Sequence, residues 1–208
     1  MSNRSEQEAL WAGQFGREYT ARNSNDAAVG SNIALFSRIL ERTGPLRSVL
    51  ELGANTGLNL RALHHLLPEA AFTAVDINPD AVKHLQGLPR VTAHCQSILE
   101  FKPDGRWDLV LTKGVLIHIQ PDLLGEVYSL MYRCAERFLC VAEYYNPSPV
   151  EVPYRGHVGM LFKRDFAGEL LDRFPHLRLV DYGFVYRRDP TFPQDDLTWF
   201  LLEKTHPQ

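Results

Sequence analysis

The sequence predicts an α/β protein with one Rossmann-like domain, built on a seven-stranded, mostly parallel sheet. Three observations support this fold class. Apolar runs of strand length alternate with segments of helical periodicity from residue 45 onward. The stretch 49–60 reads as an apolar strand, a glycine turn and the start of a helix. The last two strands are separated only by a polar, proline-containing segment, which favours an antiparallel C-terminal hairpin.

The N-terminal 44 residues are expected to form a helical cap or lid, and residues 45–208 the main body of the same structural domain. Ser5 is a suitable N-cap for a helix over 5–12, and Glu8 three residues later completes a capping box. The segment 13–30 shows no sustained pattern. A helix over 26–43 follows, ended by a glycine and a proline.

After residue 44, strands and helices alternate along the chain. Parallel strands need such helical crossovers, so the alternation supports a parallel sheet. The predicted strands are 48–52, 71–76, 91–95, 107–112, 138–144, 177–186 and 197–203, and the predicted helices are 56–67, 79–86, 123–135 and 163–174.

Composition narrows the class of function. The net charge of −3 gives no broad attraction to nucleic acid or to a membrane surface, so a small-molecule partner is expected. Cys95, Cys134 and Cys140 form no CxxC pair, and the adjacent His64 and His65 point apart on a helix, so we expect no metal site. The N-terminus lacks an apolar signal segment and no run could span a membrane, which predicts a cytoplasmic location. The oligomeric state is left open.

The most informative stretch is the turn that contains Gly53 and Gly57. Glycine lets the backbone approach a ligand closely, and Asn55 and Thr56 are suited to cap the following helix. The spacing differs from the dinucleotide fingerprint GxGxxG, and Glu51 precedes the first glycine by two residues. This pattern suits a nucleoside ligand that carries an amino acid in place of a pyrophosphate.

The predicted contacts of that ligand follow from the strand ends. Glu51 can approach a positively charged methionyl group, and Asp76, at the end of the second strand, can accept both ribose hydroxyls. Ser97 and Ile98 follow the third strand, where an adenine edge would meet a hydroxyl beside an apolar wall. The alternative is purely structural: the glycines form a tight turn, and Asp76 caps the helix at Pro79.

The chain resembles the class I S-adenosylmethionine-dependent methyltransferases over nearly its whole length, and 109–118 resembles their fourth motif. More narrowly, it is similar to the methylases associated with pseudaminic acid biosynthesis, on the segments 11–16, 19, 22–23, 143–147, 154–157, 162–166 and 181–184. One departure is Gln96-Ser97-Ile98, which stands where an acidic residue is common.

The resemblance implies S-adenosyl-L-methionine as cofactor and S-adenosyl-L-homocysteine as product. The residues expected to bind the cofactor are Trp11, Tyr19, Arg22, Glu51, Gly53, Ala54, Asn55, Thr56, Gly57, Asp76, Ile77, Ser97, Ile98, Thr112, Lys113 and Gly114. Trp11, Tyr19 and Arg22 would belong to the lid, with Arg22 near the methionine carboxylate. The alternative is that the two aromatic residues belong to the core.

The acceptor is expected at the carboxyl ends of the fourth and fifth strands. His118 is the first choice of general base because imidazole titrates near neutrality, and its alternative role is packing under the helix that follows. His157 is the second choice. It lies in the 17-residue loop 146–162, which exceeds the usual αβ connection of about 2–6 residues.

Cationic residues in and beside this loop indicate an anionic acceptor. A salt bridge from Lys163 or Arg164 to Asp165 or Glu169 is the competing explanation. The substrate-binding candidates are Glu143, Tyr145, Asn146, Tyr154, Arg155, His157, Lys163 and Arg164.

The predicted function is therefore methyl transfer to oxygen or nitrogen of a small, polar, anionic acceptor, such as a sugar, a nonulosonic acid or a nucleotide sugar. Two alternatives remain. One is a methyltransferase of another natural product or of a protein, and the other is a catalytically silent module that binds S-adenosylmethionine.

Overall fold

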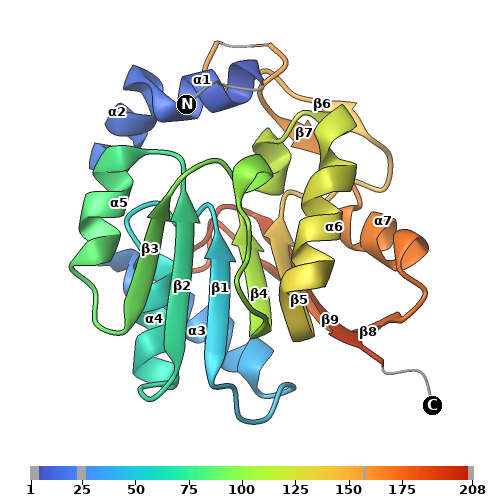
Figure 1. Ribbon diagram of the computed structural model, residues 1–208. Coiled ribbons are helices and arrows are strands. Elements are labelled where there is room, and N and C mark those ends of the chain that lie inside the picture. The colour runs from blue at the N-terminus through green and yellow to red at the C-terminus, as the bar shows by residue number, and fades with distance from the viewer. Residues whose placement is uncertain (1–4, 23–26, 157, 206–208) are drawn as a thin grey trace. The chain divides into compact units, whose positions relative to one another are not determined.

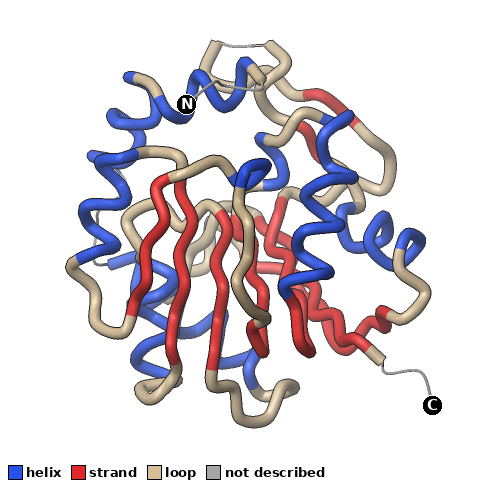
Figure 2. Tube along the Cα trace, in the orientation of Figure 1, coloured by secondary structure: helices blue, strands red, loops and turns tan. Residues whose placement is uncertain are grey.

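The computed structural model describes residues 5–22, 27–156 and 158–205. These residues divide into two compact units, Met1–Asp104 and Gly105–Gln208, and each is described by itself. Figure 1 labels the elements of both units, and Figure 2 colours their helices and strands.

The described residues of the first unit form three parallel strands, five α-helices and a short 3₁₀ helix, Ile98–Glu100, with β2 at the centre of the order β3-β2-β1. Its elements are α1 Glu6–Ala12, α2 Gln14–Arg22, α3 Ala27–Leu40, β1 Ser48–Leu52, α4 Leu58–Leu66, β2 Ala71–Asp76, α5 Pro79–Gln86 and β3 Val91–Cys95. All three strands keep the bounds expected from the sequence.

Burial explains why these strands read as apolar runs. Val49, Leu50 and Leu52 of β1 are completely buried, as are Ala74 and Val75 of β2. A parallel strand covered on both faces needs apolar residues at consecutive positions. The contiguous run at 49–52 is therefore required by the architecture that places the glycine turn directly after it.

The second unit joins two parallel strands to an antiparallel pair, in the order β4-β5-β9-β8. Its elements are β4 Trp107–Lys113, α6 Leu124–Cys134, β5 Ala135–Glu143, β6 Val150–Glu151, β7 Phe162–Lys163, α7 Phe166–Arg173, β8 Leu177–Val185 and β9 Leu197–Lys204. The antiparallel C-terminal hairpin expected from the sequence is confirmed.

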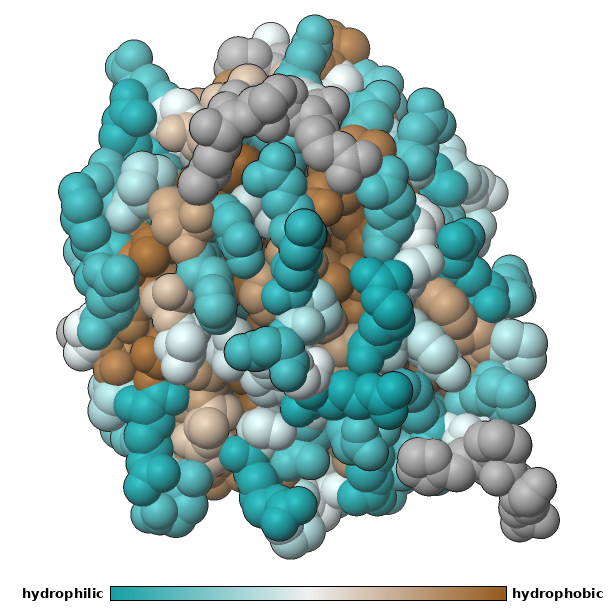
Figure 3. All heavy atoms as spheres, viewed as in Figure 1, coloured by the Kyte–Doolittle hydropathy of each residue, from teal (hydrophilic) through white to brown (hydrophobic). Residues whose placement is uncertain are grey.

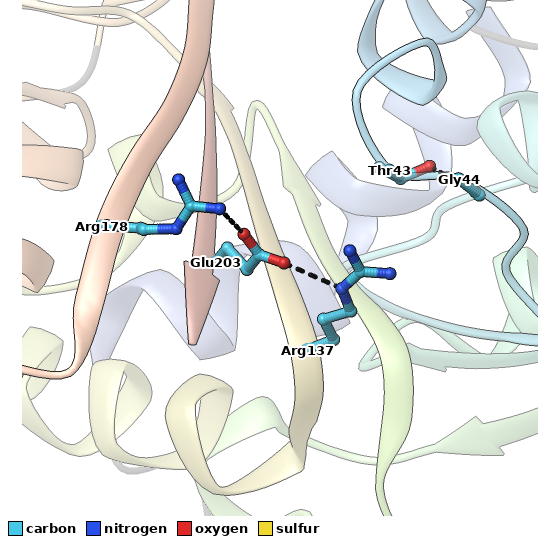
Figure 4. Close-up of polar contacts among 5 residues, drawn as sticks. All are labelled: Thr43, Gly44, Arg137, Arg178 and Glu203. Carbon is cyan, nitrogen blue, oxygen red and sulfur yellow. Dashed lines mark hydrogen bonds and ion pairs between the residues drawn. The ribbon is translucent and has the colours of Figure 1, made fainter. Parts of the chain in front are cut away.

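A charged cluster joins the three neighbouring strands of this unit. Glu203 of β9 lies between Arg137 of β5 and Arg178 of β8, and Figure 4 shows both guanidinium groups directed at its carboxylate. The Arg137 Nε atom lies 2.9 Å from Glu203 Oε1, and Arg178 donates to the other oxygen. Both arginines lower the pKa of Glu203 against the opposing effect of burial. The cluster therefore links β9 to β5 on one side and to β8 on the other.

The segment 13–30 is the clearest error of the sequence prediction, because it contains the helix α2. Gly13 ends α1 by donating its N–H to the Leu10 carbonyl oxygen, and the chain then turns into a new helix at Gln14. The hydrophobic residues of α2 are few, so its periodicity is weak in the sequence. The helix over 26–43 is also shorter than predicted, since α3 ends at Leu40.

The helix predicted over 163–174 begins three residues later, at Phe166. Asp165 is its N-cap, with a side-chain oxygen that accepts a hydrogen bond from the Gly168 N–H at 2.8 Å. Lys163 belongs instead to β7. This strand pairs antiparallel with β6, which lies within the 17-residue loop 146–162. The expectation that Lys163 and Arg164 open a helix is therefore wrong: Lys163 ends β7, and Arg164 directly precedes the N-cap.

Hydrophilic side chains predominate on the face drawn in Figure 3, with smaller hydrophobic areas between them. Among the helices of the described residues, none combines the length and the hydropathy needed to cross a membrane.

Candidate functional site

The glycine turn after β1 is held to the neighbouring strand by its own backbone. The N–H groups of Gly53 and Ala54 both donate to the Val75 carbonyl oxygen, at 2.8 and 3.2 Å. Gly53 and Gly57 have φ angles of 75° and 80°, which glycine adopts without a steric penalty. The turn therefore needs glycine at both ends.

Asp76 connects this turn to the end of β2. One carboxylate oxygen accepts the backbone N–H of Asn55 at 2.7 Å, and the other accepts that of Asn78 at 2.8 Å. Burial raises the pKa of Asp76, and these two hydrogen bonds oppose the shift. A carboxylate has about four lone-pair positions, so two backbone donors leave acceptor capacity on each oxygen.

The capping of the two helices beside Asp76 differs from the expectation. Asn78, not Asp76, is the N-cap of α5, and its side-chain oxygen accepts the Asp80 N–H at 2.9 Å. Likewise, α4 begins at Leu58 with Gly57 as N-cap and without a side-chain capping bond, so Asn55 and Thr56 do not cap it. Asp76 therefore does not cap α5, although its carboxylate holds the backbone of Asn55 and Asn78.

Gly57 also has a packing requirement. A Cβ atom at this position would lie 2.5 Å from Leu88 Cδ1 and 2.9 Å from Leu85 Cδ2. Both leucines lie at or just beyond the end of α5. These leucine methyl groups would have to shift to make room for a side chain, and the positive φ angle is the stronger reason for glycine at position 57.

The two remaining polar candidates of the first unit are buried. Glu51 has no exposed surface, and its Oε1 atom accepts a hydrogen bond from Asn59 Nδ2 at 2.6 Å. Ser97, which follows β3, is 6% exposed and donates its hydroxyl to the carboxylate of Glu8 in α1. Of the predicted capping box, the contact made by the N-cap is present: the Ser5 hydroxyl accepts the Glu8 N–H at 3.2 Å. The Glu8 side chain reaches Ser97.

The N-terminal helices of the first unit dock onto the loops that follow β1, β2 and β3. Three hydrogen bonds of long sequence separation carry this contact: Glu8 with Ser97, the Trp11 carbonyl with Asn78 Nδ2 at 3.2 Å, and Thr20 Oγ1 with Asn55 Oδ1 at 2.9 Å. Figure 1 shows α1 and α2 near the carboxyl ends of β2 and β3. A cap over the predicted nucleoside site follows from these contacts.

The aromatic residues of the cap form one cluster. The Trp11 ring makes edge contacts with the rings of Phe15 and Tyr19, at centroid distances of 5.3 and 5.1 Å. Arg22, at the end of α2, is exposed and lies 3.9 Å from Glu18. Such an exposed pair contributes little stability, so Arg22 can exchange partners.

In the second unit, Glu143 organises the loop that follows β4. Its carboxylate oxygens contact the backbone N–H groups of Val115 at 2.9 and 3.1 Å, Leu116 at 3.2 Å and Ile117 at 3.4 Å. Glu143 is only 2% exposed. Burial raises its pKa to about 7, against the lowering effect of these backbone hydrogen bonds. The carboxylate predicted to bind an acceptor therefore fixes the backbone just before His118.

His118 is the last residue of that loop's 3₁₀ turn, Leu116–His118, and is 8% exposed. Its Nδ1 atom lies 2.7 Å from the Met160 carbonyl oxygen. A carbonyl only accepts, so Nδ1 carries the proton and the neutral ring keeps a lone pair on Nε2. Burial lowers the pKa of His118 to about 4, so the imidazole is uncharged near neutrality.

Tyr154 is the loop candidate that contacts His118. The Tyr154 ring lies 4.9 Å from the imidazole, and Arg155, in the left-handed region with φ 49°, has its guanidinium 5.7 Å from the Tyr154 ring. Tyr145 is 41% exposed, and Asn146 donates its side-chain amide to the Ser148 carbonyl at 2.6 Å. His157 lies outside the described residues.

The two cations near α7 differ in their contacts. Arg164 Nε lies 2.7 Å from Glu169 Oε1, and Glu169 also accepts the Tyr128 hydroxyl at 2.7 Å, so this arginine has a structural partner. Lys163 lies with its ammonium 5.2 Å from the Tyr144 ring. The competing salt-bridge explanation is therefore confirmed for Arg164 with Glu169.

The other candidates lie at strand ends. Ala54 and Thr56 are buried in the glycine turn, and Ile77 and Ile98 are half-buried. In the second unit, Thr112 is completely buried, Lys113 ends β4, and Gly114 has a φ angle of 68°. No group of three metal-ligating side chains occurs within residues 5–22, 27–156 and 158–205.

Sequence reasoning missed several residues that shape the site. Thr20, Asn59 and the Met160 carbonyl contact candidate residues only through long-range packing, for which the sequence has no signal. The role of Asn78 as an N-cap could have been predicted, because an asparagine before a proline is a common start of a helix.

Comparison with known proteins identifies a domain within the chain. Residues 49–137 match the family model described as a methyltransferase domain. The malonyl-[acyl-carrier protein] O-methyltransferase of Anoxybacillus flavithermus is 33% identical over 84 residues. That alignment covers 39% of this chain and 31% of the relative, so the chain matches about a third of that relative's length.

Solved structures are similar over nearly the whole chain. The 1,6-didemethyltoxoflavin-N1-methyltransferase of Burkholderia thailandensis, with bound S-adenosylhomocysteine, has a TM-score of 0.72 and 20% identity, covering 99% of this chain and 92% of that one. Magnesium protoporphyrin IX methyltransferase of Synechocystis, with bound S-adenosylmethionine, has a TM-score of 0.69 and 15% identity, covering 98% and 100%. The Rossmann-like fold expected from the sequence is confirmed by these structures, and residues 49–137 are the part of the chain that matches the methyltransferase family model.

Proposed function

We propose that this protein transfers a methyl group from S-adenosyl-L-methionine to oxygen or nitrogen of a small, polar, anionic acceptor, with S-adenosyl-L-homocysteine as product. The observation that carries the proposal is Asp76, whose carboxylate stands at the glycine turn of a methyltransferase domain and keeps acceptor capacity on both oxygens. Relatives of the same fold were crystallised with this cofactor or its product.

The residues of the first unit fit the nucleoside part of the cofactor. Asp76 would accept the ribose hydroxyls, since a second hydrogen bond per oxygen needs no change in its backbone contacts. The Ser97 hydroxyl and the half-buried Ile98 would lie at the adenine. Glu51, fully buried next to the turn, supplies negative charge for the cationic methionyl part.

The cap provides the exclusion of water that methyl transfer needs. Its three long-range hydrogen bonds end on Asn55, Asn78 and Ser97, residues that flank Asp76 in the fold. Arg22 is exposed and only weakly paired with Glu18, so it is available for the methionine carboxylate. Closing the site against water strengthens the charged contacts inside it.

The cofactor supplies an activated methyl group; the chain has to orient the acceptor and remove its proton. His118 has the tautomer that this role requires, with Nδ1–H on the Met160 carbonyl and the lone pair on Nε2. With a pKa of about 4 it is a weak base that releases a proton readily. We therefore assign it orientation of the acceptor and passage of the proton onward.

The nature of the acceptor follows from the cations of the acceptor loop. The Arg155 guanidinium lies near the Tyr154 ring and the Lys163 ammonium near the Tyr144 ring. Arg155 is exposed, and within residues 5–22, 27–156 and 158–205 neither cation forms an ion pair with a carboxylate. Cations that lack an acidic partner favour an anionic ligand, with Arg155 best suited to bind a carboxylate or phosphate in a bidentate manner. A sugar, a nonulosonic acid or a nucleotide sugar meets these requirements, in keeping with the resemblance to the methylases associated with pseudaminic acid biosynthesis.

A second candidate function is a methyltransferase of another natural product or of a protein. It is favoured by the matched solved structures, which include a methyltransferase of 1,6-didemethyltoxoflavin and one of magnesium protoporphyrin IX. A silent module that binds the cofactor without turnover is the third.

Calorimetry with S-adenosylmethionine, combined with detection of S-adenosylhomocysteine in a cell extract, separates these functions. Binding with product formation supports an enzyme. Binding alone supports the silent module, and absence of binding contradicts the proposal. Mass spectrometry of extract metabolites labelled from isotopic cofactor then identifies the acceptor: labelled anionic sugars support the proposed class, and a labelled protein or porphyrin supports the alternative.

A further inference from the structure

The loop that follows β3 shares a hydrogen bond with the first helix of the chain. The Ser97 hydroxyl donates to the carboxylate of Glu8 and accepts the Leu99 N–H at 3.0 Å. A serine hydroxyl has one proton and two lone pairs. Because that proton goes to Glu8, Ser97 has none to donate to a ligand, and the stronger acceptor at this loop is the Glu8 carboxylate.

Glu8 brings to this loop an acidic side chain that the loop itself lacks. Residues 96–98 contain no acid, and Glu8 lies 89 positions before Ser97 in the chain. Glu8 is only 9% exposed, although a carboxylate is costly to bury without hydrogen bonds. The same helix is held by the Trp11 carbonyl, which accepts a hydrogen bond from Asn78 Nδ2 at 3.2 Å. The fold therefore fixes a carboxylate from α1 beside the end of β3.

The strand order places this carboxylate at one end of the predicted nucleoside site. β2 lies between β1 and β3, and Asp76 pairs with Cys95 at the ends of their strands. The Gln96 N–H donates to the Asp76 carbonyl oxygen at 3.0 Å, so the loop with Ser97 starts directly beside Asp76. The base and the methionyl part of the cofactor extend in opposite directions from its ribose. With the ribose at Asp76 and the methionyl part at the glycine turn after β1, the base extends toward β3 and Glu8.

Adenine presents a donor that a carboxylate can accept. Its amino group carries two hydrogens, whereas guanine has a carbonyl oxygen at the same ring position. An ionised carboxylate only accepts hydrogen bonds, so it attracts the amino group and not the carbonyl. The half-buried Ile98, next to Ser97, would supply an apolar contact for the ring. Glu8 thus has the chemistry to recognise adenine by its amino group.

We propose that Glu8 accepts a hydrogen bond from the adenine amino group of the cofactor and so determines the preference of the site for adenine. This inference rests on the proposed function, because it requires the cofactor ribose at Asp76. Ser97 is a positioning residue, whose hydroxyl orients the Glu8 carboxylate. The helix α1 is therefore part of the cofactor site as well as its cover.

Isothermal calorimetry of the full chain with two ligands tests this assignment. The ligands are S-adenosylhomocysteine and its deamino analogue, in which a hydrogen atom replaces the adenine amino group. The parent is expected to bind the analogue roughly 10- to 150-fold more weakly, because a hydrogen bond to a charged group is lost. In Glu8→Gln this ratio should shrink by roughly five- to tenfold, since the neutral amide is a weaker acceptor of the same size.

The ratio of the two affinities separates recognition of the base from docking of the helix. Weaker docking of α1 would lower the affinity for both ligands alike and leave their ratio as in the parent. Glu6→Gln is the matched control, because it removes the same charge from an exposed position in the same turn of α1, and it should keep the parent ratio. Ser97→Ala should also keep most of it, since the carboxylate that contacts the amino group would remain.

The outcomes keep this inference apart from the proposed function. A parent that binds S-adenosylhomocysteine and its deamino analogue equally would overturn the role of Glu8, whether or not any variant folds, and would leave cofactor binding in place. An unchanged ratio in Glu8→Gln, or a ratio lost in Ser97→Ala instead, would also overturn it. A parent that binds neither ligand would contradict the proposed function itself, together with the inference.

Discussion

The carboxylate of Asp76 accepts the backbone N–H of Asn55 at 2.7 Å, which ties the end of β2 to the glycine turn that follows β1. Asn55 has a positive φ angle of 46°, and its side-chain oxygen accepts the Thr20 hydroxyl of α2. One residue of the turn therefore connects to the predicted ribose acceptor through its backbone and to the cap through its side chain. We therefore expect binding of a nucleoside at Asp76 and docking of α2 to be coupled through Asn55.

Asp76→Ala is expected to weaken binding of S-adenosylhomocysteine by about 1.5–3 kcal/mol, because a charged hydrogen-bond acceptor is lost. This corresponds to a roughly 10- to 150-fold higher Kd. Isothermal calorimetry measures the change. Asp80→Ala, which removes an acid paired with Lys83 on the neighbouring helix, is the control and should keep the parent affinity. Equal affinity of Asp76→Ala and the parent would remove Asp76 from the site.

His118→Ala is expected to lower the rate of methyl transfer more than it changes cofactor affinity. Its Nε2 lone pair would be lost from the acceptor site, whereas no candidate cofactor contact includes it. Turnover is followed by S-adenosylhomocysteine release, and affinity by calorimetry. His176→Ala, at an exposed position before β8, should match the parent in both. Unchanged turnover in His118→Ala would mean that His118 is not the general base, so that His157 takes this role or no base is used.

The lowered pKa of His118 predicts a pH dependence of stability. Because the folded protein holds this residue neutral, its contribution is fully present above pH 6.5 and is lost as pH falls from 6.5 toward about 4. The free energy of unfolding of the parent should therefore fall over this range relative to His118→Phe, by up to roughly 3 kcal/mol. Denaturant titration at several pH values measures the difference, and a constant difference from pH 4 to 7 would contradict it.

Glu143 predicts the opposite trend at higher pH. Its pKa is raised, so its contribution is fully present below about pH 4.5 and is lost as pH rises through about 7. The stability of the parent relative to Glu143→Gln should decline over this interval, measured by the same titrations. Glu203→Gln is the matched control, because the pKa of Glu203 is lowered. A parent curve parallel to that of Glu143→Gln would show that the backbone hydrogen bonds outweigh burial.

Gly16→Ala is expected to weaken the docking of α1 and α2 onto the loops that follow the strands of the first unit. A Cβ atom at this buried position would lie 1.8 Å from the Trp11 carbonyl oxygen and 2.7 Å from Asn78 Nδ2, so the hydrogen bond between these atoms would break. Hydrogen exchange should become faster in α1 and α2. Gly30→Ala, where no atom lies within 4 Å, should stabilise α3 by about 0.5–1 kcal/mol and leave the cap unchanged. Parent-like hydrogen exchange in Gly16→Ala would show that the added Cβ atom does not disturb the docking of α1 and α2.

The sequence by itself determined the elements whose burial leaves a periodic signature. The bounds of β1, β2 and β3 were predicted correctly because parallel strands covered on both faces require apolar runs, and the glycines of the turn followed from their spacing. The stretch that matches the methyltransferase family model begins at the same strand. By contrast, α2 was not predicted, because its few apolar residues give only a weak helical periodicity.

Only the tertiary structure decided what the polar candidates contact. Glu143 was predicted to bind an acceptor and instead holds the backbone of residues 115–117, and Arg164 is paired with Glu169. The docking of the cap through Glu8 and Thr20 was likewise invisible in the sequence. Apolar burial depends on local periodicity, which the sequence displays directly. Hydrogen-bond partners separated by tens of residues depend on the path of the chain, which no local pattern encodes.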